Sequence, residues 1–108
     1  MATDVIRVMP DYQSYPTWRP GTGEYNVDPE KLPISKELAD ELNAWGDEYD
    51  ATLVLDDPAS SGFPDAAAEE DFAERGLRLA QRLAAEVAGR FQVEYHDIRT
   101  GRRQTLAG

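Results

Sequence analysis

Glu94 and His96 come closest, by residue type and spacing, to the groups needed for acid–base chemistry. They lie two positions apart in the alternating stretch FQVEYHDI, residues 91–98, so they share one face of a predicted strand. Asp97 points to the other face. A general base needs an orienting partner and a nucleophile, and the sequence supplies neither beside this pair. We therefore expect no catalytic residues, and a small enzyme using Glu94 and His96 is the least supported alternative.

Metal ions and phosphates are also poorly matched by the sequence. The chain has no cysteine and His96 is its single histidine, which disfavours zinc. Clustered carboxylates such as Asp56 and Asp57 can bind Ca²⁺ or Mg²⁺, but their spacing does not fit a calcium-binding loop. Gly21-Thr22-Gly23 lacks the third glycine and the lysine of a phosphate-binding loop. We expect no metal and no cofactor.

The distribution of charge is the most informative feature of the sequence. The net charge is −10, and residues 37–74 contain thirteen acidic residues with no lysine or arginine. A surface of this kind repels the phosphates of nucleic acid and attracts a basic protein. A merely solvated, solubilising face is the alternative interpretation. If a basic partner binds, the residues expected to attract it are Asp47, Glu48, Asp50, Asp56, Asp57, Glu70 and Asp71.

Residues 10–34 are predicted to form an irregular loop that is rich in proline, glycine and aromatic residues. Tyrosine and tryptophan often anchor protein interfaces because they bury a large area with few rotatable bonds. We therefore expect Trp18 and Tyr25 to contact a partner. The equally weighted alternative is that Trp18 and its neighbours fold back as a lid on the core.

The chemistry-bearing residues must be positioned by two strands and two helices. Alternation predicts a strand over residues 4–9, with Ile6 and Val8 on one face. Ser35 is a good N-cap for a helix beginning at Lys36, with an apolar stripe at Leu38, Leu42, Trp45 and Tyr49. Residues 52–55 fit either the end of this helix or a short strand.

The second half of the chain is predicted to contain a helix followed by a strand. A helix should begin at Pro64, or at Asp65 as its cap, and run to about residue 88, with Gly89 ending it. The strand over 91–98 follows. Residues 99–108 are expected to fray, and a short strand through Gln104–Leu106 is the alternative.

These elements predict one α+β domain over residues 1–108. The order is β-α-α-β, with a helical hairpin packed on a small antiparallel sheet, because the hairpin reverses the chain and returns it. Two strands alone are marginal. Either the 10–34 loop supplies another strand, or an open sheet edge pairs with a partner or with a second copy in a homodimer.

Targeting signals are not evident in the sequence. Asp4, Arg7 and Pro10 interrupt the first residues before a signal-peptide core can form. No apolar run approaches the ~18 residues needed to span a membrane. We expect a cytoplasmic protein that does not bind membranes.

Three segments carry a resemblance to a protein family. The first strand followed by DYQSYPTW, then LPISKELADELNAWGDEYDATL and DDPASSGF, resembles a group of short acidic proteins of actinobacteria over roughly residues 5–98. No activity is established for that group, so no site residue carries over. The resemblance implies an immunity partner of a polymorphic toxin.

The leading hypothesis is a non-enzymatic, acidic protein-binding module that blocks a basic toxin domain or nuclease. A homo-oligomeric structural or accessory protein is the second.

Overall fold

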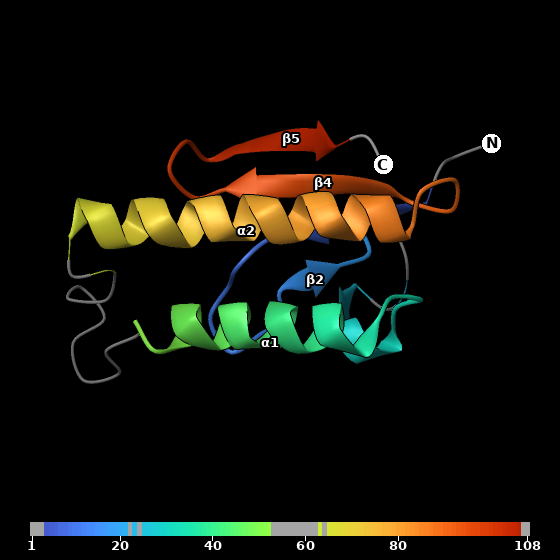
Figure 1. The fold of residues 1–108 in the computed structure, drawn as a ribbon, viewed down its shortest axis with the longest axis horizontal. Coiled ribbons are helices and arrows are strands. Elements are labelled where there is room, and N and C mark those ends of the chain that lie inside the picture. Colours follow the sequence, from blue (N-terminus) through green and yellow to red (C-terminus); the bar gives the residue numbers. More distant parts are fainter. Residues whose placement is uncertain (1–3, 22, 24, 53–62, 64, 107–108) are drawn as a thin grey trace.

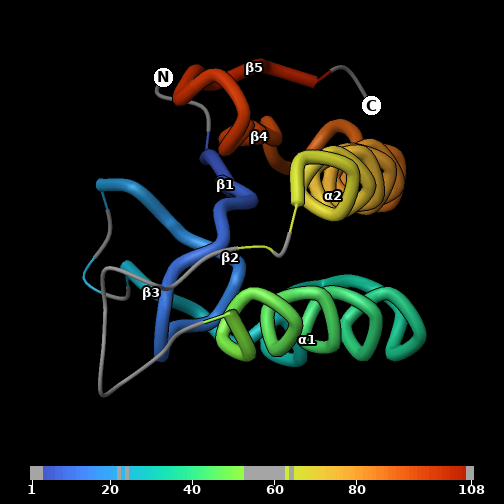
Figure 2. Tube along the Cα trace, turned by 90° about the vertical axis from the view of Figure 1, so that its left-hand side faces the viewer, coloured from blue at the N-terminus to red at the C-terminus, as the bar shows by residue number. Residues whose placement is uncertain are grey.

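A five-stranded mixed sheet carries both long helices on one of its faces (Figures 1 and 2). The computed structural model describes residues 4–21, 23, 25–52, 63 and 65–106. The strand order is β3-β2-β1-β4-β5. The elements are β1 (Val5–Val8), β2 (Thr17–Trp18), β3 (Asn26–Val27), the 3₁₀ helix η1 (Pro29–Lys31), α1 (Lys36–Asp50), α2 (Ala66–Glu86), β4 (Gln92–Asp97) and β5 (Arg102–Leu106). The predicted α+β class is confirmed.

The sheet face beneath the helices forms the core. Ile6 and Val8 of β1 are fully buried there, beside Val93 and Tyr95 of β4. Arg7 and Glu94 alternate to the opposite face, as the period of two requires. The alternation predicted for both strands is therefore confirmed.

Both helices begin at side-chain caps. The Ser35 Oγ accepts a hydrogen bond from the Leu38 amide, and the Asp65 carboxylate accepts one from the Ala68 amide. Each cap satisfies an amide that has no partner inside the helix. The helix start at Lys36 is confirmed, and of the two starts considered for the second helix the structure has the Asp65 cap. Helix α2 ends at Glu86, and Gly89 lies three residues further along the chain. Gly89 has a φ of +82°, which glycine adopts readily, and the chain turns there toward β4.

The helices meet each other and the sheet around Trp45. Its ring stacks on Phe72 with centroids 4.6 Å apart, and its Nε1 donates to the Phe72 carbonyl at 3.0 Å. Tyr95 donates its hydroxyl proton to the Ala73 carbonyl at 2.7 Å. Buried hydroxyl and indole groups need such partners, and both find them on α2. Burial also raises the pKa of Tyr95.

The predicted antiparallel relation of the two flanking strands is wrong. β1 and β4 are parallel neighbours, with Ile6 opposite Val93 and Val8 opposite Tyr95. The reason lies between β3 and α1. β3 runs in the sense of β1 because both pair antiparallel with β2. Residues 28–35 then return the chain so that α1 runs in this same sense, which is also that of β4 (Figure 1).

Two further expectations are corrected by the structure. Residues 10–34 are not wholly irregular, since they supply β2 and β3 by antiparallel pairing; this is the extra strand that one alternative required. Residues 102–106 do not fray but form β5 against β4, with Val93 opposite Leu106. Helix α1 ends at Asp50 and Thr52 lies in a turn, whereas residues 53–55 fall outside the described residues.

Among the described residues, neither helix combines the length and the apolar character that crossing a membrane demands.

Candidate partner-binding groove

A groove of about 520 Å³ lies between the second half of α1 and the segment that leads into β2. One wall is α1, with Asn43, Gly46, Asp47 and Asp50. The other wall is residues 13–16. Asn26 and Glu30 complete the lining. We call this feature the acidic groove.

Close contact between the loop and α1 forms the floor of the acidic groove. A Cβ added at Gly46 would lie 3.3 Å from the Pro16 ring, so the glycine lets the two segments approach closely. The Asn26 side chain holds the opposite wall, because it accepts from the Tyr15 amide at 3.0 Å and donates to the Tyr15 carbonyl at 2.8 Å. Asp50 fixes the end of that wall by accepting from the Gln13 amide at 2.8 Å.

Three carboxylates give the acidic groove its charge: Glu30, Asp47 and Asp50. None of them forms an ion pair within the part of the chain that the structure describes. Asp47 and Asp50 also lie in the last turn of α1, which contains no basic residue. The helix dipole is negative at that end, so it adds to the negative potential of the groove.

The adjacent Tyr49 side chain also lies in a negative environment. Its pKa is raised, first by burial and then by the neighbouring Tyr12, on which its ring stacks at 4.6 Å. The carboxylates of Asp11 and Glu69 raise this pKa further. Negative charge therefore gathers around the C-terminal end of α1.

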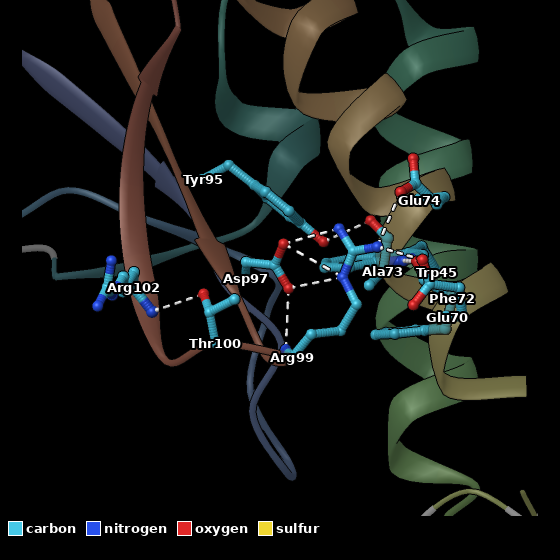
Figure 3. Close-up of polar contacts among 10 residues, drawn as sticks. All are labelled: Trp45, Glu70, Phe72, Ala73, Glu74, Tyr95, Asp97, Arg99, Thr100 and Arg102. Atoms are coloured by element: carbon cyan, nitrogen blue, oxygen red, sulfur yellow. Dashed lines mark hydrogen bonds and ion pairs between the residues drawn. The ribbon is translucent and has the colours of Figure 1, made fainter. Parts of the chain in front are cut away.

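The other acidic residues predicted to attract a partner are paired with arginines. Glu48 accepts two hydrogen bonds from Arg75, at 2.6 and 2.7 Å, and Asp71 accepts a third at 2.9 Å. Glu70 lies 2.8 Å from Arg99 (Figure 3). These three carboxylates are therefore ion-paired, with two arginines between them, whereas Asp47 and Asp50 form no ion pair in the described residues. Asp56 and Asp57 lie outside the described residues.

Arg99 is the centre of the largest of these clusters. It also binds Glu74 at 2.8 Å and Asp97 at 2.7 Å, so it joins the turn after β4 to α2 (Figure 3). Its hydrogen bonds to Asp97 hold the pKa of that carboxyl below the ordinary value. The cluster ties the turn after β4 to α2, and its three carboxylates outnumber its single guanidinium, so it keeps a net negative charge.

The two predicted aromatic anchors lie away from the acidic groove. Trp18 is only 7% exposed and donates its Nε1 proton to the Met9 carbonyl at 2.9 Å; it lies opposite Arg7, on the sheet face away from the helices. Tyr25 packs against Trp18 with centroids 5.0 Å apart and is 45% exposed. Tyr15, which is equally exposed, lines the groove instead.

Sequence reasoning missed Tyr15, Glu30 and Asn43 as groove residues. Tyr15 belongs to the aromatic segment that the sequence singled out, but its position depends on the path of that segment. Glu30 and Asn43 carry no local signal, because their meeting depends on the packing of η1 against α1.

The Glu94–His96 pair is not arranged as an acid–base couple. The Glu94 carboxylate accepts from the Arg7 guanidinium at 3.1 Å, whereas His96 lies opposite Arg103 of β5. No hydrogen bond joins Glu94 to His96 in the described residues. Within the same residues, no group of three or more histidine or acidic side chains is placed to hold a metal ion.

Comparison with known proteins gives a family match. The model of a family described as Serratia CdiI immunity protein-like matches residues 4–98, from just before β1 to just after β4. None of the curated proteins matches the sequence.

Proposed function

Because the chain belongs to the Serratia CdiI immunity protein-like family, we propose that it is an immunity protein that binds a contact-dependent inhibition toxin and keeps it inactive. The match carries this proposal, since it spans four of the five strands and both helices. The activity is binding and not catalysis. It takes place in the cytoplasm of the cell that makes the protein, where an incoming toxin must be stopped.

The charge of the chain supports a basic surface on the toxin. A net charge of −10 on 108 residues produces a negative field that accelerates encounters with a basic protein. A nuclease domain would present such a surface, because it must bind phosphates. Tight inhibition then depends on short-range contacts formed after the encounter.

The decisive experiment is protection of growth. We expect a contact-dependent inhibition toxin to be encoded beside the gene for this chain, and its toxin domain is induced in a bacterial host, with and without this protein. We expect the protein to restore growth and to co-purify with the toxin domain. The immunity protein of an unrelated toxin serves as the control and should do neither. Failure of the cognate pair to associate, with growth still arrested, would remove the proposal.

One observation favours a second candidate, a homo-oligomeric accessory protein. β5 is an edge strand, and four of its five residues are exposed. Such an edge can pair with a second copy by strand addition. Light scattering decides the matter, since a mass that stays monomeric at high protein concentration dismisses this candidate.

A further inference from the structure

We propose that the acidic groove receives a basic segment of the toxin, with a lysine or arginine side chain inserted between Tyr15 and the end of α1. This inference rests on the proposed function and assigns the contact site within it. It concerns Glu30, Asp47 and Asp50, and not the acidic stretch as a whole.

The groove carboxylates differ in ion pairing from other acidic residues of α1 and α2. Along α1 and α2, Glu41, Glu48 and Glu70 each lie within 2.8 Å of an arginine nitrogen. The groove carboxylates form no ion pair in the described residues, although seven arginines follow residue 74 and Lys36 acts on Glu30 at longer range. The fold thus pairs those three acids and not the groove carboxylates, so charge complementarity selects a cationic occupant.

The acidic groove also has the size and lining of a binding pocket. The volume of about 520 Å³ lies within the range of about 300–1,000 Å³ that is usual for binding pockets. Tyr15 is 45% exposed at its wall, and a guanidinium or ammonium group can stack on such a ring. Asn43 and the Gly46 turn of α1 form the facing wall. A long cationic side chain fits a groove with a tyrosine in its wall and carboxylates in its lining.

The acidic residues in the last turn of α1 oppose the stability of that helix. Acidic residues in the last turn of a helix interact unfavourably with its dipole, and α1 has Asp47 and Asp50 there with no compensating base. The Asp47 carboxylate forms no hydrogen bond or ion pair within the described residues, so no side-chain contact offsets this cost. Residues that break a local rule without a structural compensation are typical of functional surfaces.

The test compares two double variants with the same change in net charge. Asp47→Asn with Asp50→Asn neutralises the acidic groove, and the asparagine at 50 still offers an acceptor to the Gln13 amide. Glu37→Gln with Glu41→Gln neutralises two residues of the same helix, near Arg82 and outside the groove lining. Titration calorimetry with the toxin domain encoded beside the gene gives the dissociation constants, and thermal melting confirms that each variant is folded.

We expect the groove variant to bind the toxin domain about tenfold or more weakly, and the control variant to stay within about twofold of wild type. Tyr15→Ala should also weaken binding, and Tyr15→Phe should restore most of it because the ring is retained. Equal weakening by the two double variants would mean that charge acts only at long range, and would overturn the inference. Unchanged binding by the groove variant would also overturn it while leaving the proposed function intact. A wild-type protein that does not bind the toxin domain would instead refute the proposed function, and the inference with it.

Discussion

Position 76 of α2 has room for a hydrogen atom and nothing larger. A Cβ built there would lie 2.3 Å from Cζ2 of Trp45 and 2.6 Å from the Tyr95 hydroxyl. Gly76 lies on the buried face of α2, but the sequence does not reveal that two aromatic rings converge on it. The glycine therefore allows the contact between α2, α1 and β4.

Gly76→Ala should destabilise the protein by about 1–3 kcal/mol, although alanine gains about 1 kcal/mol in helix propensity. The reason is that Trp45 and Tyr95 are almost fully buried and cannot move aside without losing their hydrogen bonds to Phe72 and Ala73. Urea unfolding measures the change. A midpoint equal to or above that of wild type would show that the core at this position is looser than described.

Asp47→Asn should stabilise the isolated protein by roughly 0.3–1 kcal/mol, because it removes an exposed, unpaired acid from the negative end of α1. Asp40→Asn is the matched control. It changes the net charge equally but removes the 2.8 Å ion pair with Lys36, so it should give no comparable gain. Thermal melting of the two variants decides the question. Destabilisation by Asp47→Asn would indicate a structural partner for this carboxylate.

At the scale of elements, local signals predicted starts and faces but not strand direction. The Ser35 cap, the alternation of β1 and β4 and the apolar stripe through Trp45 are all local patterns, and the structure has each of them. The parallel pairing of β1 with β4 depends on the return path of residues 28–35, which no periodicity encodes. β2 and β3 have only two residues each, too few to show alternation.

The turn after β4 is attached to α2 by charge, and this attachment predicts a dependence on pH. Arg99 lowers the pKa of Asp97 in the folded protein, so the unfolded chain takes up that proton more readily. The stability contributed by Asp97 is therefore complete above the unfolded value of about 4 and is lost as the pH falls through the lower folded value.

Arg99→Gln should reduce this acid-dependent loss. Denaturation midpoints measured from neutral pH down to about pH 2 should fall less steeply in the variant than in wild type. The variant should also be less stable at neutral pH, because Glu70, Glu74 and Asp97 all lose their common partner. Parallel curves for the two proteins would contradict the role given to Arg99.

For the whole molecule, the sequence predicted the amount of negative charge better than its location. Thirteen acids without a base between residues 37 and 74 suggested one continuous patch. Several of those acids pair with arginines from later in the chain. Arg75 and Arg82 of α2 pair with acids of α1, and Arg99 in the turn after β4 pairs with Glu70 of α2. Among the described residues, Glu30, Asp47 and Asp50 of the acidic groove are carboxylates with which none of these arginines pairs.

The most direct test of the account is the rate of association between this protein and the toxin domain encoded beside its gene, measured by stopped-flow mixing as salt is increased. Screening shortens the reach of charges to about 3 Å at 1 M salt. We expect a complex of one protein with one toxin domain, whose association rate falls steeply with salt while its dissociation rate changes little. An association rate that stays constant from low to high salt, or the absence of any complex at low salt, would contradict an acidic immunity protein that captures a basic toxin.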